Sequence, residues 1–424
     1  MLLIFSESIT DRLRYVCHFI LKEQLGLDYT ITSDIAQCSF TVQRIINYSH
    51  QSIEGAFFTI RPHAILFEKE IKEQNTDCIQ SNGQTSFFNI NNSDIEFDIF
   101  AAVFYLISRY EEYLPHSKDQ YGRYAHENSI AYQNNFLHIP LVNIWIEMFY
   151  KKIKATFPEI TCYKPAFKTI ITYDIDIAWS YLHKGLWRSM GGMLKTPSLE
   201  RLKVLLNISK DPFDSYDFLN ELHQNNNTDV IYFFLIANKK GDFDKNISPK
   251  KRAFQKLVQN HAKNHPVGLH PSWISFMRED YLKAEKSCLE AITKSKIINS
   301  RQHYIKFDLP YTYQQLINAG IQNDFSMGYG SINGFRASAA SSFFWYDLTN
   351  ETFTNLRVFP FCFMDANCHY EQHQTIDESK IELLYYRDIC NQTNGLFIPI
   401  FHNNFMGSDP AFKGWKEVYE ALFD

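Results

Sequence analysis

Short apolar runs alternate with amphipathic helical patterns throughout the second half of the chain, and this alternation limits the folds open to it. Seven runs rich in β-branched and aromatic residues predict strands, at 166–173, 229–237, 267–269, 297–300, 321–325, 356–363 and 396–401. Helical patterns separate most of them, at 213–224, 249–264, 281–293, 311–319 and 376–390. Such alternation predicts a parallel sheet or a closed barrel, because neighbouring parallel strands need a crossover between them.

The pattern changes near residues 158–165. Before this point, apolar segments at 97–110 and 141–153 have helical spacing. We therefore place a domain boundary near residue 163, with one domain at 1–163 and a second at 164–424. A chain of 424 residues is long enough to hold both.

Composition and charge exclude some classes of function. Hydrophobic residues make up 45% and charged residues 21%, as is usual for a globular chain with a buried core. The 42 basic and 47 acidic residues give a net charge of -5, so the chain lacks the basic excess that neutralises nucleic-acid phosphates. No apolar stretch approaches the roughly 20 residues that span a bilayer, so we expect no membrane span.

The cysteines and the first residues predict a cytoplasmic location. Eight cysteines are scattered without a C-x-x-C pair, which favours reduced, buried thiols over a disulfide framework or a zinc–thiolate site. The initial apolar run breaks at Ser6 and Glu7, and no basic region precedes it, unlike in a secretory signal.

Polar and ionisable side chains recur at or just past the carboxyl ends of the predicted strands. They are Asp174, Asp176, Asn238, His270, Arg301, His303, Asp324, Ser326, Asp365 and His402. In β/α barrels the catalytic groups lie on this edge. A single polar residue at a strand end means little, because loops are usually polar. Polar residues at the ends of all seven predicted strands, however, predict a functional site at this edge.

Asp174 and Asp176 form the first candidate pair. Alternation along a strand places them on one face, with Ile175 on the other. Two neighbouring carboxylates repel each other unless a cation or a shared proton lies between them, so this pair suits a metal ligand next to a base. The structural alternative is a pair of solvated loop acids or helix caps.

Three later segments carry histidine at strand ends. His270 stands between Gly268-Leu269 and a proline, and neutral imidazole suits zinc, nickel, cobalt or iron. Arg301 and His303 share a face, so the arginine could hold a carboxylate while the histidine completes a metal triad. His402 could act as a general acid near neutral pH. The alternatives are a hydrogen-bonded structural histidine at each position and a structural ion pair at Arg301.

Residues 330–338, GSINGFRAS, place two glycines near Arg336. A glycine-containing stretch with an arginine could cradle a phosphate or touch substrate, but no G-x-G-x-x-G or Walker sequence is present. An ordinary connecting loop is the alternative interpretation.

The segments TYDID, GLHPS, RQH, NDFS and FIPIFH occur in the order of the motifs of the polysaccharide deacetylases, the NodB homology proteins of carbohydrate esterase family 4. The resemblance covers residues 166–402. Three earlier segments, SRYEEYLPH, YGRYAHENS and PLVNIW, resemble the N-terminal domain of Bacteroidetes-type members. The resemblance implies an α/β fold: a distorted (β/α)7-type barrel preceded by a smaller α+β domain of unknown role.

The resemblance also implies roles at the matching positions. Asp174 matches the catalytic base, Arg301 the arginine that orients it, and His402 the catalytic acid. Asp324 matches the supporting aspartate of the fourth motif.

The same resemblance implies one divalent metal, with zinc favoured over nickel, cobalt and iron. Asp176 and His270 match two of its ligands. Family members carry a second histidine four residues after the first, where this chain has Ile274, which cannot bind a metal. We expect His303 to take its place from the neighbouring strand.

The expected function is metal-dependent hydrolysis of an acyl group, N-acetyl first, from a glycan or glycan precursor. Two other functions stay open: a barrel that binds carbohydrate without turnover, and a metal amidase that acts on a small amide. The sequence predicts no oligomeric state.

Overall fold

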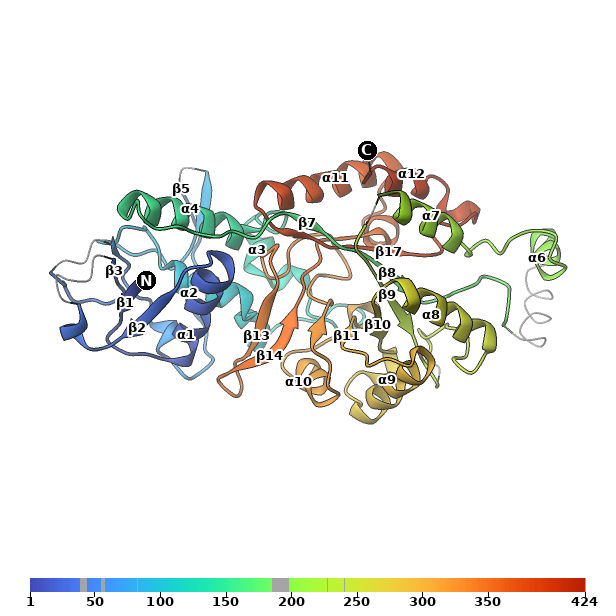
Figure 1. The fold of residues 1–424 in the computed structure, drawn as a ribbon, viewed down its shortest axis with the longest axis horizontal. Helices are drawn as coiled ribbons and strands as arrows, with labels where there is room; N and C mark the ends of the chain where they lie inside the picture. Colours follow the sequence, from blue (N-terminus) through green and yellow to red (C-terminus); the bar gives the residue numbers. More distant parts are fainter. Residues whose placement is uncertain are drawn as a thin grey trace. The chain divides into compact units, whose positions relative to one another are not determined.

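The computed structural model describes residues 1–38, 44–54, 58–81, 83–184, 198–226, 228–239 and 241–423. Contacts divide the chain into two compact units (Figure 1). Unit 1 comprises Met1–Lys168, Gly334–Pro360 and Ile389–Leu396, and unit 2 comprises Thr169–Asn333, Phe361–Asp388 and Phe397–Asp424. Unit 1 therefore takes in two segments from the second half of the chain.

Unit 1 is built on a small parallel sheet. Its strands, in spatial order, are β2 (Tyr29–Thr32), β1 (Leu2–Phe5), β3 (Ile45–Asn47) and β4 (Phe58–Thr59). The helices of the unit are α1 (Asp11–Cys17), α2 (Ile99–Ile107), α3 (Ile130–Gln133) and α4 (Leu141–Thr156). All nine residues of α2 are buried, which is expected of a helix that is apolar on every side. Asp98 caps its first turn by accepting a hydrogen bond from the amide of Ala101 at 3.0 Å.

Two antiparallel hairpins complete unit 1. β5 (Ile79–Ser81) pairs with β6 (Gln84–Ser86), and β13 (Phe343–Asp347) pairs with β14 (Thr352–Val358). The first hairpin lies in a polar stretch without a strand pattern. Its turn contains Gly83 at a φ of +74°, a conformation that glycine adopts without strain.

The segment 330–338 does not offer its arginine to a ligand. Arg336 is 1% exposed, and its guanidinium donates two hydrogen bonds to the carboxylate of Glu112. Gly334 leaves room for Leu137, whose side chain would lie 2.7 Å from an added Cβ. The interpretation as a phosphate cradle or substrate loop is therefore wrong for Arg336, which holds unit 1 together instead.

The described part of unit 2 contains seven parallel strands. Their spatial order is β12 (Asn323–Asp324), β11 (Asn299–Ser300), β10 (Val267–His270), β9 (Val230–Leu235), β8 (Ile171–Ile175), β17 (Pro399–His402) and β15 (Phe363–Met364). Within unit 2, the first of these strands in sequence, β8, pairs with the last, β17. The mixed α/β fold with a parallel sheet is confirmed. Closure into a barrel is not among the pairings of the described strands, so the seven-stranded barrel stays a prediction.

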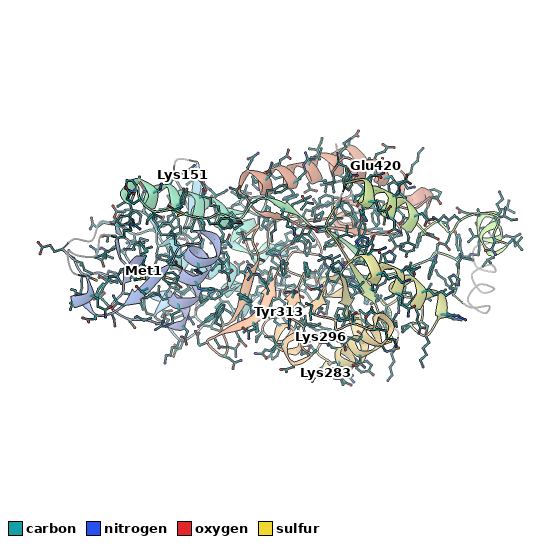
Figure 2. All side chains as sticks on the ribbon, in the orientation of Figure 1. Met1, Lys151, Lys283, Lys296, Tyr313 and Glu420 are labelled. Atoms are coloured by element: carbon teal, nitrogen blue, oxygen red, sulfur yellow. The ribbon has the colours of Figure 1, made fainter. Side chains whose placement is uncertain are left out.

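Helices alternate with these strands. They are α6 (Leu199–Leu205), α7 (Tyr216–Asn226), α8 (Arg252–Asn264), α9 (Glu279–Thr293), α10 (Tyr311–Asn318), α11 (Ile376–Gln392) and α12 (Trp415–Glu420). The helices α7 to α11 overlap the five predicted helices, whereas α6 and α12 lie where the sequence analysis predicts none. Lysines such as Lys151 of α4 and Lys283 of α9 project outward from their helices (Figure 2). Among the described residues, no helix is both long enough and apolar enough to cross a membrane.

The predicted strand at 356–363 is wrong as one element. The structure divides it between β14, which ends at Val358, and β15, which begins at Phe363. Pro360 lies between them and has no amide hydrogen for a sheet ladder, so the apolar run cannot continue as one strand. The run at 396–401 is likewise divided between β16 (Leu396–Phe397) and β17, and β16 pairs with β7 (Lys168–Thr169).

A buried group of histidine and tyrosine side chains comes from β8, β9, α7 and α8. The hydroxyl of Tyr173 lies 2.9 Å from Nε2 of His223, and the rings of Tyr232 and His261 are 4.3 Å apart. His261 directs Nδ1 to the carbonyl oxygen of Leu257 at 2.9 Å, while its buried Nε2 has no hydrogen-bond partner in the described part of the chain. Burial lowers the pKa of His223 to about 3 and that of His261 to about 4.

We expect His261→Phe to reduce the sensitivity of the fold to acid. Between a pH of about 6.5 and about 4, the unfolded chain binds a proton at His261 that the folded chain does not, so wild-type stability falls as the pH falls. This one group accounts for about 3 kcal/mol of the loss. Urea unfolding at neutral and mildly acidic pH measures the difference. His50→Phe, at an exposed histidine, should lose as much stability as the wild type. An equal loss in His261→Phe would contradict the assignment.

Candidate metal centre and active site

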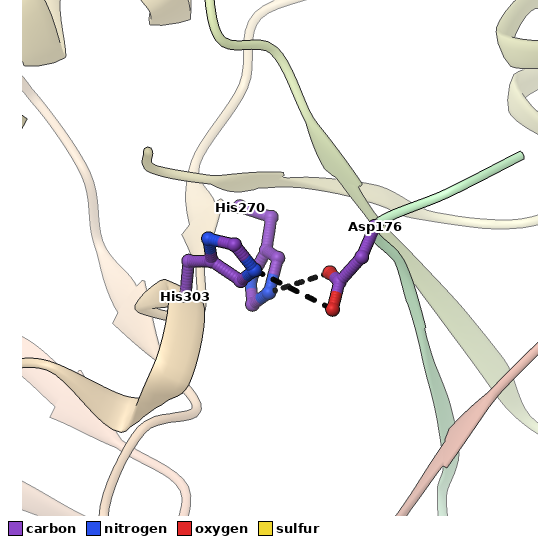
Figure 3. Close-up of side chains that lie close together, drawn as sticks. All are labelled: Asp176, His270 and His303. Carbon is purple, nitrogen blue, oxygen red and sulfur yellow. Dashed lines mark ion pairs between the residues drawn. The ribbon is translucent and has the colours of Figure 1, made fainter. Parts of the chain in front are cut away.

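Asp176, His270 and His303 converge at the carboxyl ends of β8, β10 and β11 of the same sheet (Figure 3). One potential ligand atom from each residue lies within 4.8 Å of the other two. Nε2 of His270 is 3.1 Å from Oδ1 of Asp176, and Nε2 of His303 is 3.5 Å from Oδ2. Both histidines are buried, whereas Asp176 is partly accessible. The structure thus brings together the three residues that the sequence singles out as metal ligands.

The orientation of His270 is set by a backbone contact. His270 ends β10, and its Nδ1 lies 2.6 Å from the carbonyl oxygen of Arg301. A carbonyl oxygen only accepts hydrogen bonds, so Nδ1 carries a proton and Nε2 is the ring atom that faces Asp176.

His303 has an acidic partner on its other side. Its Nδ1 lies 3.1 Å from Oδ1 of Asp244, a residue in the long connection after β9. The same carboxylate accepts the backbone amide of Trp273 at 2.8 Å, which fixes its position. A carboxylate behind a metal-binding histidine is a common arrangement, because it fixes the tautomer and makes the facing nitrogen a better ligand. No sequence signal marks Asp244, which stands nine residues past the end of β9 in an irregular segment.

The three facing groups fit a cation. If each Nδ1 donates outward, two imidazole lone pairs and a carboxylate face one another, and all of them are acceptors. Oδ1 of Asp176 is buried and has no hydrogen-bond partner among the described residues. Burial lowers the pKa of His303, but the carboxylates of Asp176 and Asp244 outweigh it and raise the pKa to about 9. The cluster therefore needs an additional positive charge, either a proton or a metal ion, and two imidazoles with one carboxylate are a donor set that zinc uses.

Asp174 lies next to this cluster and is paired with Arg301. Nη1 of Arg301 donates to Oδ1 of Asp174 at 3.0 Å and to Oγ1 of Thr172 at 2.7 Å, and Nε donates to the carbonyl oxygen of Phe325 at 3.0 Å. Arg301 is fully buried, with its guanidinium 4.6 Å from the centre of the Phe233 ring. The other oxygen of Asp174 is 3.8 Å from Nε2 of His270. Asp174 thus has one oxygen held in place and one directed toward the cluster.

His402 approaches the cluster from β17. Its Nε2 is 3.8 Å from Oδ2 of Asp176, and its Nδ1 is 2.6 Å from Oδ1 of Asp365. The backbone amide of His402 donates to the second oxygen of Asp365 at 2.7 Å. Burial lowers the pKa of His402, but Asp365, Asp176 and Asp174 outweigh it and raise the pKa to about 10. The sequence marks Asp365 only as a polar strand end, and its partnership with His402 appears only in the fold.

Asp324 is the last residue of β12 and is fully buried. It accepts hydrogen bonds from the hydroxyl of Tyr313 at 2.9 Å and from the amide and hydroxyl of Ser326 at 2.9 and 2.8 Å. The Ser326 hydroxyl in turn accepts the amide of Gln302, which stands between Arg301 and His303. Burial raises the pKa of Asp324 to about 6. Among the described residues, its hydrogen bonds go to Tyr313 and Ser326 and not to the facing groups, so its geometry suits a positioning residue.

Ile274 stands at the position where the deacetylase motif has its second histidine, and in the structure His303 faces Asp176 instead. Ile274 lies in a short turn (Trp273–Ser275), where its side chain packs near Gly241. His303 approaches Asp176 from the segment after β11 instead.

Comparison with known proteins finds a family match for the first part of the chain. Residues 2–158 match the family model of a family of unknown function, DUF7033. The match covers less than half of the chain and assigns no activity to it. No curated protein matches the chain.

Three solved structures show distant likeness. A Mycobacterium smegmatis protein named as a polysaccharide deacetylase is 10% identical, with a TM-score of 0.40 over 61% of this chain and 84% of that one. One so named from Pseudomonas aeruginosa PAO1 is 11% identical, with a TM-score of 0.39 over 61% and 86%. The polysaccharide deacetylase Bc1974 from Bacillus cereus is 12% identical, with a TM-score of 0.29 over 60% and 88%. All three likenesses are too distant to assign fold or function.

Proposed function

We propose that this chain is a metal-dependent hydrolase that removes an acyl group, N-acetyl first, from a glycan or glycan precursor. The observation that carries the proposal is the cluster of Asp176, His270 and His303, with Asp174 and His402 on its border. A metal site needs the cluster alone, whereas amide hydrolysis also needs a base and an acid beside it. The motif order supports the glycan substrate.

Asp176, His270 and His303 would hold the metal through one carboxylate oxygen and two Nε2 atoms. Three protein ligands are the usual set of a catalytic zinc site. A bound divalent metal supplies Lewis acidity, which polarises a carbonyl group and makes a water molecule more acidic. Asp244 and the carbonyl oxygen of Arg301 fix the two imidazoles from behind, so the ligands are oriented before the metal arrives.

Asp174 would take the proton of the attacking water. Arg301 fixes one of its oxygens and leaves the other toward the cluster, which is the geometry a general base needs.

His402 would give a proton to the leaving amine. Asp365 holds its Nδ1, so Nε2 is the atom that faces the reaction space. Asp365 outweighs the effect of burial and raises the pKa of His402, which favours the protonated form that a general acid needs.

In this proposal, residues 1–163 form an accessory domain and residues 164–424 form the catalytic domain. A cytoplasmic location and a precursor as substrate belong to the same proposal. The competing function is a barrel that binds carbohydrate without turnover. Acetate release from N-acetylated oligosaccharides by the metal-loaded protein separates the two: binding without release would favour the competing function.

We expect about one divalent metal per chain in protein purified without chelator. Asp176→Ala, His270→Ala and His303→Ala should each lose most of it, because each removes one of three ligands. Elemental analysis of the purified chains measures the content. His50→Ala, at an exposed histidine, should keep the wild-type content. Full metal content in His303→Ala would exclude His303 as the replacement for the missing histidine. A wild type that takes up no zinc, nickel or cobalt would overturn the metal site.

A further inference from the structure

Five large apolar side chains lie exposed within ten residues of unit 2. Their exposed fractions are 80% for Leu199, 40% for Leu202, 37% for Leu205, 60% for Leu206 and 68% for Ile208. We call these five residues the apolar patch. Single exposed leucines are common on soluble proteins, but a contiguous group of this kind marks a contact surface.

The patch faces outward because the other side of its helix is held. Ser198 caps the start of α6, and its hydroxyl accepts a hydrogen bond from the amide of Arg201. Val204 is fully buried, and the guanidinium of Arg201 lies 4.9 Å from the centre of the Tyr181 ring. Leu199, Leu202 and Leu206 follow the i, i+3, i+7 spacing of one helix face, opposite to Val204. Figure 1 shows α6 set apart from the other helices of unit 2.

Basic residues outnumber acidic ones around the patch. Residues 177–210 contain six lysines and arginines and one acidic residue, Glu200, although Lys210 is paired with Asp214 and Asp217 just beyond this stretch. Within the described part of this stretch, Lys203 is exposed next to the patch. Exposed leucines beside basic residues are the pattern of segments that lie on an anionic membrane surface, where apolar side chains enter the headgroup boundary and cations meet lipid phosphates.

In the sequence, α6 lies in the connection that follows β8, the strand that carries Asp174 and directly precedes Asp176. In β/α folds these connections form the rim around the active site. A docking surface here belongs to the connection that follows the proposed base and metal ligand.

We propose that the apolar patch docks this protein on the surface of an anionic lipid bilayer. The binding itself does not depend on the hydrolase proposal. One consequence does rest on the proposed function: docking through this connection favours a substrate whose acylated sugar is carried by a lipid at the membrane surface.

Vesicle co-sedimentation of the full chain tests the proposal. Vesicles of phosphatidylcholine alone are compared with vesicles that also contain phosphatidylglycerol, at low and high salt. The wild type should bind the anionic vesicles, and added salt should weaken the binding. Leu199→Glu/Leu206→Glu should weaken it by about tenfold or more, because two apolar contacts are replaced by charges that the lipid repels. Ile317→Glu/Ile381→Glu, at two exposed isoleucines elsewhere in unit 2, is the matched control and should bind like the wild type.

Three results would overturn the proposal. The wild type would fail to bind either vesicle, the patch variant would bind as well as the wild type, or binding would ignore the anionic lipid. A wild type that self-associates, with the patch variant monomeric and no vesicle binding, would assign the patch to a second copy of the chain. Thermal unfolding of both variants checks that they fold, and the salt and lipid dependence of the wild type tests the proposal without any variant. Metal content and acetate release are measured separately, so failure of docking leaves the hydrolase proposal standing.

Discussion

Asp174→Asn should lower hydrolysis by about 10²- to 10⁴-fold, the usual contribution of a general base, while the metal content stays at the wild-type level. The amide keeps the shape of the carboxylate and can still accept the hydrogen bond of Arg301, but it cannot take a proton from water. Rates of acetate release at saturating metal, with elemental analysis of the same sample, measure both quantities.

The metal measurement separates two explanations of a slow variant. Asp176→Asn, two residues along the same strand edge, should lose metal together with activity, because it weakens a ligand. Asp280→Asn, at an exposed aspartate of α9, should change neither. If Asp174→Asn kept a tenth or more of the wild-type rate, Asp174 would not be the base. If it lost metal, Asp174 would be a ligand instead.

Glu112→Ala should lower the free energy of unfolding by about 3–5 kcal/mol, the typical cost of removing one partner from a buried ion pair. The carboxylate of Glu112 accepts hydrogen bonds from Arg336 at 2.8 and 2.6 Å and from Arg109 at 2.7 Å. All three residues belong to unit 1 and none is more than 4% exposed. Burial raises the pKa of Glu112, but Arg336 and Arg109 outweigh it and lower the pKa to about 2. The variant leaves two buried guanidinium groups without their shared anion.

Urea unfolding followed by circular dichroism measures this loss. Glu127→Ala is the matched control, since Glu127 is mostly exposed and its nearest partner, His126, lies 3.5 Å away. Exposed pairs contribute about 0–1 kcal/mol, so the control should stay close to the wild type. A loss below about 1 kcal/mol in Glu112→Ala would show that the cluster does not hold unit 1 together.

The candidate cluster is predictable from the sequence for a physical reason. Parallel strands joined by helices bring all their carboxyl ends to one edge, so residues far apart in the chain meet there once the strands are identified. Asp176, His270 and His303 each stand at or just past such an end. The prediction that His303 takes the place of a ligand at position 274 rests on the same reasoning, because neighbouring strands deliver their side chains to the same place.

The sequence by itself thus determines the parallel α/β pattern of unit 2 and the edge at which the ionisable groups collect. Local periodicity and strand order carry that information, and neither depends on distant contacts. Only the tertiary structure decides which partner each group has. Asp244 reaches His303 from an irregular connection, Asp365 turns Nε2 of His402 toward Asp176, and Arg336 is buried against Glu112 far away in sequence. Such pairings depend on which side chains are buried together and on the paths of the loops. The ion pairs form where the folded chain excludes water from both partners. No local sequence pattern encodes this.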